Sequence, residues 1–315
     1  MQVSIVVPLF NKARYVARCL TSILNQNFTD FELIVVNDGS TDEGEEVVRS
    51  FSDERVRLIN QANAGPGAAR NRGMGDARGE FIAFLDADDE WLPGYLEQSL
   101  RILMNHPETA ATTCCYVESP STTDMREFWS KRGIVPGLHR TTPETRADIL
   151  VQIVAYMLPC STVSRIGALR KLGGFYQGDH CRYAEDAFLW IQILLNYPVF
   201  FTLEPLVRIH RDAAELSKNL AGCRPVEPFL QRPDLLQRSC PENLRPLLDR
   251  FLAIRAFKTA CVLGYWGHWR EARAVRAQFK AHAGWAAPYF LPSLVCSTPV
   301  GSLLGATWRR SIRRS

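Results

Sequence analysis

The sequence contains no C-x-x-C pair, although it has nine cysteines in 315 residues. This odd, scattered set argues against a zinc site or a disulfide framework and is typical of buried thiols in a reducing compartment. No signal peptide is evident, because MQVSIVVPLF begins directly with a strand-like run. Hydrophobic residues make up 46% and charged residues 22%, as in soluble globular proteins. We expect a cytoplasmic protein with one large domain, or a core domain plus an appendage.

Acidic residues are scarce at the C-terminal end of the chain. Residues 216–315 hold 16 Lys and Arg against 5 Asp and Glu, a net charge of +11. Residues 1–215 hold 21 against 28, a net charge of −7. Such an asymmetry indicates different partners for the two parts. We expect the chemistry in the acidic part and an anionic surface as the partner of the basic part.

Continuous apolar runs of strand length alternate with segments of helical period. This pattern predicts an α/β fold with a mostly parallel, Rossmann-like sheet covered by helices on both faces. Residues 118–150 look irregular, and the chain becomes helical and Arg-rich beyond about residue 215. The predicted strands are 3–10, 31–36, 56–60, 81–85, 109–117 and 199–210, and the clearest helices are 68–77, 95–104, one starting near 185, 247–265 and 269–281.

Polar side chains follow three of these strands at the point where each strand ends. Asn11 follows the first strand, Asp38 the second, and Asp86-Ala87-Asp88 the fourth. In parallel sheets ligands bind at the carboxyl ends of the strands. We therefore expect these side chains to converge on one edge of the sheet.

The stretch FIAFLDADDEW places four carboxylates within five residues after a buried strand. Crowded carboxylates need a cation or exposure to water. A calcium loop is disfavoured because Trp91 stands where a glycine is required. An acidic turn that caps the helix after Pro93 remains an alternative. Together with Asn11 and Asp38, the cluster favours a site for Mg²⁺ or Mn²⁺ bridging to a diphosphate.

Three further signals are ambiguous when they are taken alone. Gly65-Pro66-Gly67-Ala68-Ala69-Arg70 imitates a dinucleotide fingerprint, but it ends in Arg and lacks the ribose acid, so an NAD enzyme is disfavoured. It is either a nucleotide-binding turn, in which Arg70 reaches base or phosphate, or a plain helix entry. An isolated Glu185-Asp186 pair is better explained as a helix cap. His210 alone is better explained as a packed or surface histidine than as a ligand.

In combination, the motifs resemble those of family 2 glycosyltransferases. The segments VSIVVPLFN, FELIVVNDGSTD, NAGPGAARNRG, FIAFLDADDEW, LGGF, AEDAFLW and VRIH occur in the family's order over residues 1–215. The resemblance implies a GT-A type fold and transfer of a sugar from a nucleotide donor with inversion at the anomeric carbon. It also implies a nucleotide-binding half, 1–117, and an acceptor half, 118–215, followed by a basic helical extension, 216–315.

The resemblance also implies a role for each matching residue. Asp88 would ligate the divalent cation under the diphosphate, and His210 would approach the metal or diphosphate. Asp186 would be the catalytic base, positioned by Glu185. The donor-binding residues would be Pro8, Phe10, Asn11, Asp38, Arg70 and Asp86, with Asp38 on the base edge and Asp86 facing the ribose or a metal-bound water.

The sequence departs from the family pattern at Phe10, Asn37 and Ala184, where Tyr, Asp and Gly are commoner. None of these changes removes a group on which the chemistry depends. A non-catalytic nucleotide-sugar-binding module is the main alternative, and the presence of Asp88 and Asp186 disfavours it. A nucleotidyltransferase would leave Glu185-Asp186 unexplained. We expect a UDP-sugar donor, a glycan or lipid-linked glycan acceptor, a role in surface polysaccharide biosynthesis, and no nucleic-acid partner.

The C-terminal part matches none of these motifs. Residues 264–272 resemble a tetratricopeptide-type hairpin, although a single hairpin forms no repeat array. Residues 283–308 carry no charge and precede four arginines, but three prolines interrupt them. Arginines after a single membrane span would place the catalytic part outside the cytoplasm. We therefore expect peripheral contact with the inner face of the cell membrane, with Trp285, Tyr289, Phe290 and Trp308 at headgroup level; an apolar tail folded onto the protein is the alternative.

Overall fold

The computed structural model of the chain describes residues 1–178, 181–213, 222–282 and 287–312, with the side chains of 306–312 outside the described part. Contacts divide the chain into two compact units. Unit 1 comprises residues 1–141 and 154–215, and unit 2 comprises residues 142–153 and 216–315.

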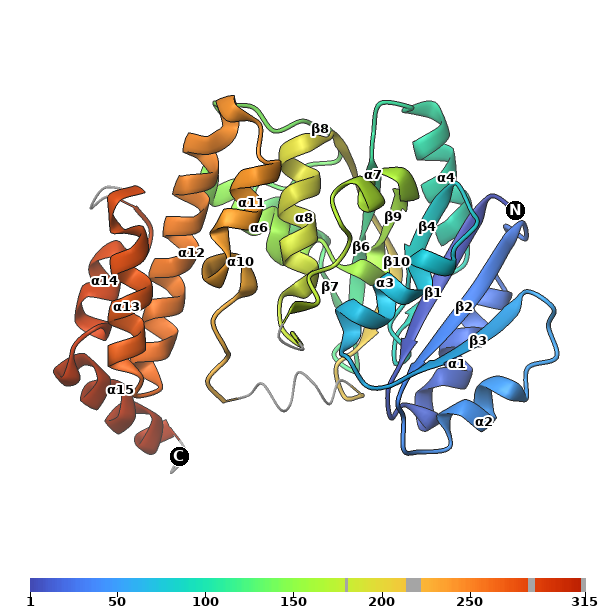
Figure 1. The fold of residues 1–315 in the computed structure, drawn as a ribbon, viewed down its shortest axis with the longest axis horizontal. Helices are drawn as coiled ribbons and strands as arrows, with labels where there is room; N and C mark the ends of the chain where they lie inside the picture. Colours follow the sequence, from blue (N-terminus) through green and yellow to red (C-terminus); the bar gives the residue numbers. More distant parts are fainter. Residues whose placement is uncertain (179–180, 214–221, 283–286, 313–315) are drawn as a thin grey trace. The chain divides into compact units, whose positions relative to one another are not determined.

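Unit 1 is built on one ten-stranded sheet with the order β3-β2-β1-β4-β9-β6-β10-β5, in which β7 pairs with β6 and β8 pairs with β10 (Figure 1). The strands are β1 Val3–Leu9, β2 Phe31–Asp38, β3 Val56–Gln61, β4 Phe81–Phe84, β5 Glu90–Trp91, β6 Ala111–Ser119, β7 Thr123–Asp124, β8 Gly137–His139, β9 Thr162–Arg165 and β10 Val199–His210.

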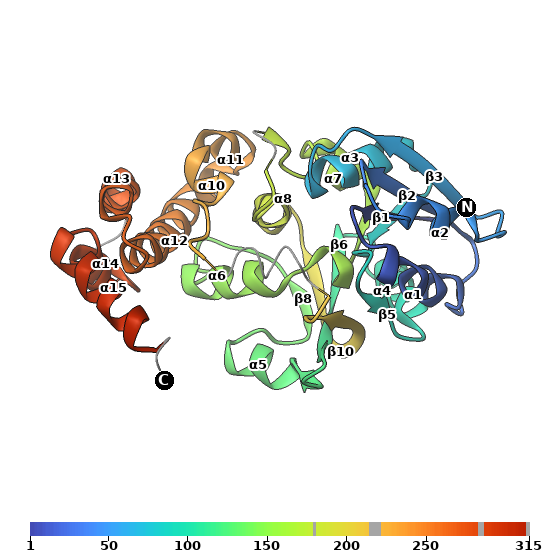
Figure 2. The same cartoon turned by 90° about the horizontal axis from the view of Figure 1, so that it is seen from below.

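Helices cover both faces of this sheet, as the continuous apolar strands predict. Figure 2 shows α3, α7 and α8 on one face and α1 and α4 on the other. Strands β1, β2 and β4 are almost wholly buried because neither of their faces meets water. The helices are α1 Ala13–Leu24, α2 Gly44–Arg49, α3 Pro66–Asp76, α4 Tyr95–Asn105, α5 Arg126–Lys131, α7 Ile166–Lys171 and α8 Glu185–Asn196.

The expected α/β class and GT-A type arrangement are confirmed, but the sheet is more mixed than the apolar runs indicate. Strands β3, β2, β1 and β4 run parallel, as do β6 and β10. Strand β9 lies antiparallel between β4 and β6, and β5, β7 and β8 are antiparallel to their neighbours. Residues 118–150 are also more ordered than expected, since they contain β7, α5 and β8.

Unit 2 is helical in its described residues. Its long helix α12, Arg245–Tyr265, packs against α13, Trp269–Phe279, and against α14, Phe290–Cys296, and α15, Pro299–Ile312. The shorter helices α10, Pro228–Gln231, and α11, Pro233–Ser239, precede it, and α6, Ala147–Tyr156, begins in this unit. Within the described ranges, no helix combines the length and the apolar character needed to cross a membrane.

Candidate active site

The parallel register brings the ends of β1 and β2 to one edge, where the chain turns sharply. Leu9 is paired with Asn37, so Asn11 and Asp38 emerge close together. Asn11 adopts a positive φ of 53°, which Asn tolerates better than most residues. Its backbone N–H donates to Ser40 Oγ at 3.1 Å, and its Oδ1 accepts the Thr41 N–H at 2.8 Å. The two turns are thereby fixed to each other.

The Asp38 carboxylate holds the glycine turn that precedes α3. Its Oδ1 accepts the Ala64 N–H at 2.8 Å, and its Oδ2 accepts the Gly65 N–H at 2.9 Å. Gln61 donates a third hydrogen bond to Oδ1 at 2.8 Å. Asp38 is buried, and charge-assisted bonds of this kind are the stronger class. The strand end at Asp38 and the glycine turn at Gly65, which are separate in the sequence, are therefore hydrogen-bonded to each other.

The acidic turn after β4 is contacted by groups from distant parts of the chain. Lys12 Nζ lies 2.8 Å from Asp88 Oδ2, and the same ammonium donates to the Ala213 carbonyl at 2.7 Å. The His210 N–H donates to Asp89 Oδ1 at 2.9 Å. The His210 ring faces Glu90, with 3.2 Å between Nε2 and Oε1. The structure thus brings His210 to the acidic turn, with its ring against Glu90.

Burial and mutual repulsion perturb the acids of this turn. Burial raises the pKa of Asp88, the Asp86 charge raises it further, and Lys12 opposes both effects. Burial also raises the pKa of Asp89 well above its usual range, with added contributions from the charges of Asp88 and Asp86. Such a cluster stays ionised only with a cation close by.

Arg70 joins the acidic turn to the start of α8. Its guanidinium donates to Asp86 Oδ1 at 2.7 Å and to Glu185 Oε1 at 2.8 Å. Its side chain is only 5% exposed and lies over the Phe175 ring at 5.3 Å. Burial lowers the pKa of Arg70, but the Asp86 and Glu185 carboxylates outweigh it, so the pKa is raised above the usual value. Arg70 is a fixed internal cation between two acids.

Asp186 lies in the first turn of α8, next to Glu185. Burial and the Glu185 charge raise the pKa of Asp186 to about 7, against the opposing effect of Arg70. Its Oδ1 accepts the Ala187 N–H at 2.8 Å, and among the described residues its Oδ2 accepts no hydrogen bond. A half-buried carboxylate that titrates near neutral pH is suited to proton transfer.

The backbone before α8 explains why glycine is common at position 184. Ala184 adopts φ 58° and ψ 24°, the left-handed conformation, in which a residue with a Cβ is strained by roughly 1–2 kcal/mol. The sequence alone shows no consequence of this substitution, because the backbone angle cannot be read from it.

Sequence reasoning missed three residues that assemble the site. Lys12 reads as an ordinary surface residue, and its pairing with Asp88 depends on the turn after β1. Asn71 accepts the Phe175 N–H at 2.8 Å and donates to the Phe175 carbonyl at 2.8 Å, which fixes the LGGF turn against α3. A Cβ on Gly174 would lie 2.4 Å from Asn71 Oδ1, so this contact requires the glycine. The LGGF motif, which ends at Phe175, was the sequence signal that could have identified this residue.

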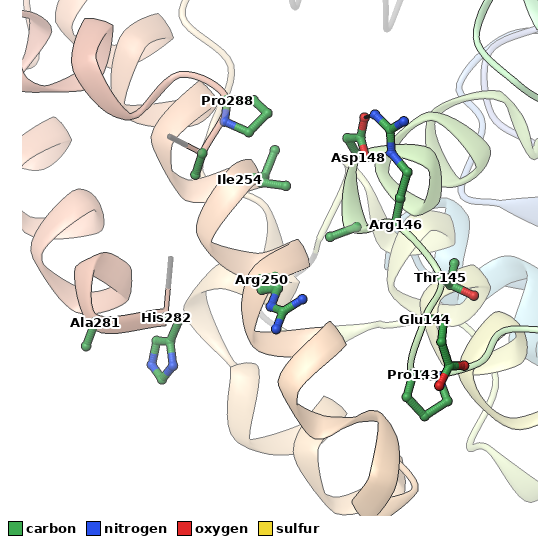
Figure 3. Close-up of a pocket in the computed structure, with 12 residues that line it drawn as sticks. Pro143, Glu144, Thr145, Arg146, Asp148, Arg250, Ile254, Ala281, His282 and Pro288 are labelled. Atoms are coloured by element: carbon green, nitrogen blue, oxygen red, sulfur yellow. Dashed lines mark hydrogen bonds and ion pairs between the residues drawn. The ribbon is translucent and has the colours of Figure 1, made fainter. Parts of the chain in front are cut away.

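One cavity in unit 2 has none of the predicted site residues in its lining (Figure 3). It has a volume of about 820 Å³. Arg250 projects into it from α12, with Ile254 on the same helix, and Arg146 pairs with Asp148 on its other side. Its lining shows no cluster of acids that could serve as a base or a metal site.

Within the described residues, no group of three or more His, Cys, Asp and Glu side chains is arranged to hold a metal ion by itself. The donor set nevertheless fits a cation that shares its ligands with a diphosphate. Asp86 and Asp88 offer hard carboxylate oxygens, and Mg²⁺ often takes only one or two carboxylates plus substrate phosphates. The ion pair between Asp88 and Lys12 shows that this position already holds a positive charge.

Comparison with known proteins gives a consistent result. The sequence model of glycosyl transferase family 2 matches residues 4–172. The chain is 43% identical over 116 residues to EpsH of Bacillus subtilis, which carries a glycosyltransferase name. That match covers 36% of this chain and 33% of EpsH, so the chain spans about a third of the relative's length.

Two solved structures share the fold over nearly the whole chain. The first is residues 1–349 of S. aureus TarS in complex with UDP-GlcNAc, with a TM-score of 0.69, 18% identity, and coverage of 99% of this chain and 92% of that one. The second is the mannosyltransferase PcManGT from Pyrobaculum calidifontis with GDP-Man and Mn²⁺. It has a TM-score of 0.56 and 19% identity, and covers 100% of this chain and 88% of that one.

Proposed function

Because the chain belongs to glycosyl transferase family 2, we propose that it is a glycosyltransferase that transfers a sugar from a nucleoside diphosphate, with inversion, to a hydroxyl group. The observation that carries this proposal is the buried Arg70, which bridges Asp86 of the acidic turn and Glu185 beside Asp186. The Arg70 side chain thereby connects the expected donor site to the helix turn that carries the expected base, Asp186.

We assign the catalytic base to Asp186. The acceptor hydroxyl attacks the anomeric carbon, the bond from that carbon to the diphosphate oxygen breaks, and the hydroxyl proton passes to the Asp186 carboxylate. A positioned base of this kind contributes roughly 10²–10⁴-fold to the rate. Glu185 is a positioning residue, because its ion pair with Arg70 at 2.8 Å fixes the first turn of α8.

We propose that Asp88, assisted by Asp86 and His210, holds a divalent cation of the Mg²⁺ or Mn²⁺ type. When it is bound, such a cation supplies Lewis-acid stabilisation of charge on the leaving diphosphate. The chain's own contribution is a pair of partly buried carboxylates, of which Asp88 pairs with Lys12 and Asp86 pairs with Arg70. PcManGT was solved with Mn²⁺ and GDP-Man, which supports this proposal.

The donor pocket is assigned to the edge formed by β1, β2 and the turn before α3. Pro8, Phe10 and Asn11 come from the end of β1, and exposed Phe10 offers an aromatic face for a base. Asp38 acts through the Gly65 turn that it fixes, as well as at the base edge. We propose UDP as the nucleotide, residues 1–117 as the nucleotide-binding half and 118–215 as the acceptor half. TarS was solved with UDP-GlcNAc, which supports a UDP donor.

We further propose that the acceptor is a glycan or lipid-linked glycan of surface polysaccharide biosynthesis, and that transfer occurs at the inner face of the cell membrane. The net charge of +11 in residues 216–315 supports contact with anionic lipid.

A non-catalytic module that binds a nucleotide sugar remains the second candidate, and one experiment separates the two. Purified protein is incubated with a panel of UDP- and GDP-sugars and Mn²⁺, and release of nucleoside diphosphate is measured. Turnover that Asp186→Asn abolishes, while donor binding persists, supports the transferase. Binding of a donor without any release by the wild type, with acceptor supplied, favours the binding module.

A further inference from the structure

The two C-terminal helices, α14 and α15, expose large apolar side chains to water. Six large apolar side chains on them are 40–67% exposed: Leu291, Leu294, Val295, Val300, Leu303 and Leu304. Their spacing of i, i+3 and i+4 on each helix places them on one face of that helix. We call these six residues the outer apolar face.

The opposite sides of the same helices carry small polar residues that are buried. Ser293, Ser297 and Ser302 are 0%, 7% and 6% exposed. The Ser293 hydroxyl donates to the Phe290 carbonyl at 2.6 Å, and the Ser297 hydroxyl donates to the Ser293 carbonyl at 2.6 Å. These bonds offset the cost of burying the hydroxyls. The pattern is the reverse of that of a helix on a water-soluble surface.

Glycines allow this pair of helices to approach α12 closely. A Cβ on Gly264 of α12 would lie 2.1 Å from the Cys296 carbonyl oxygen, and one on Gly305 of α15 would lie 2.9 Å from the Tyr265 backbone. Close packing through Gly and Ser, with large apolar residues outward, is characteristic of helices that contact lipid. The large apolar side chains of these helices therefore lie on the exposed side, where burial requires an apolar partner.

The charge of the C-terminal segment indicates which apolar partner fits the outer apolar face. From residue 272 to residue 315 the sequence contains seven Lys and Arg and no Asp or Glu. Arg309, Arg310, Arg313 and Arg314 directly follow the outer apolar face along the chain, outside the described side chains. An apolar helical face combined with arginines matches an interface where acyl chains lie beneath anionic headgroups.

We propose that the outer apolar face of α14 and α15 docks in the plane of an anionic lipid surface, with the helices lying on it. This proposal adds a docking surface to the proposed location at a membrane. It depends on the proposed function only for the identity of that membrane, since lipid binding requires no sugar transfer. The expected aromatic anchors are only partly in place. Tyr289 is exposed, Phe290 packs edge-on against Phe257 with ring centroids 5.2 Å apart, and Trp285 and the Trp308 side chain lie outside the described residues.

The test is sedimentation of the full-length protein with vesicles of phosphatidylcholine, with or without phosphatidylglycerol. We expect binding to the anionic vesicles. The double substitution Leu303→Ser, Leu304→Ser should reduce the partition coefficient by roughly tenfold or more per leucine. The double substitution Arg309→Gln, Arg310→Gln should reduce it by about fivefold per arginine, and less at high salt.

Leu138→Ser is the matched control, because Leu138 is a similarly exposed leucine in β8 of unit 1. It should bind anionic vesicles like the wild type. Nucleoside diphosphate release with a soluble acceptor should be unchanged in all three variants. Because vesicle binding is measured separately from sugar transfer, the binding result stands even if the protein shows no transfer activity.

Several outcomes overturn the proposal. These are no binding of the wild type to anionic vesicles, equal binding to neutral vesicles, and undiminished binding of the leucine double variant. Analytical ultracentrifugation adds another: if the wild type forms a dimer that the leucine substitutions abolish, and does not bind vesicles, the face is covered by a second copy of the chain.

Discussion

Replacing Arg70 by Met should destabilise the protein far more than the same replacement of Arg72, two residues further along α3. Arg70 is almost completely buried and pairs with Asp86 and Glu185. Arg72 is 55% exposed, and among the described residues its ion-pair partner is Asp76 of the next helical turn. The two variants thus make the same chemical change on the same helix in opposite environments.

The magnitudes follow from burial. Removing one partner of a buried ion pair costs about 3–5 kcal/mol, because the remaining charge is left uncompensated. Glu185 is buried and Asp86 is about one-third exposed, so most of this cost arises at Glu185. For a folding unit of about 200 residues, the size of unit 1, such a loss lowers the melting temperature by roughly 6–20 °C. An exposed pair such as Arg72–Asp76 is worth about 0.3–0.5 kcal/mol, and its loss should shift melting by no more than about 2 °C.

Thermal melting followed by circular dichroism measures both variants. Arg70→Lys should fall between Arg70→Met and the wild type, because a single ammonium cannot reach both carboxylates with the geometry of a guanidinium. Nucleoside diphosphate release should fall in Arg70→Met and stay normal in Arg72→Met. An Arg70→Met protein that melts together with Arg72→Met would refute the argument that Arg70 joins the donor site to α8.

The remaining predictions concern the base and the metal. Because Asp186 must be ionised to accept a proton and its pKa is raised to about 7, kcat/KM should rise about tenfold per pH unit below pH 7 and level off above it; a profile flat between pH 5 and 8 would contradict this. Folded Asp186 holds its proton more tightly than the unfolded chain does, so its contribution to stability is lost as pH rises through about 7, and Asp186→Asn should melt higher than the wild type at pH 8. Asp88→Ala should lose metal-dependent donor binding in calorimetry, as chelation of the wild type should; full activity in excess EDTA would exclude the metal assignment. Lys12→Met should bind Mn²⁺ more tightly than the wild type without nucleotide, because the ammonium 2.8 Å from Asp88 Oδ2 no longer competes; weaker Mn²⁺ binding, measured by electron paramagnetic resonance, would show that Lys12 supports the site instead.

The sequence predicts the elements that depend on long apolar runs and predicts poorly those that depend on distant pairing. Strands β1 and β2 are recognisable because each is a largely apolar, almost wholly buried run with no competing helical period. Strand β9 has only four residues, and nothing in them shows that it inserts antiparallel between β4 and β6. Helix α5 is one and a half turns long, too short for its period to stand out among the charged residues around it.

The same contrast holds for the candidate site. Its acids can be found from their place at strand ends, but their partners cannot. Arg70 reaches Glu185 across 115 positions of sequence, and Lys12 meets Asp88 only because two turns fold together. The pKa of Asp186 depends on burial and on Glu185, and neither its value nor the strained angle of Ala184 is encoded in any local pattern.

The central claim is that Asp186 removes the acceptor proton in a single displacement from a nucleotide sugar. Proton NMR of the product formed from an α-linked UDP-sugar tests it most directly, with wild type and Asp186→Asn compared under the same conditions. The account predicts a β-linked product from the wild type, and no product from Asp186→Asn despite normal donor binding. An α-linked product, or a β-linked product formed by Asp186→Asn at the wild-type rate, would contradict it.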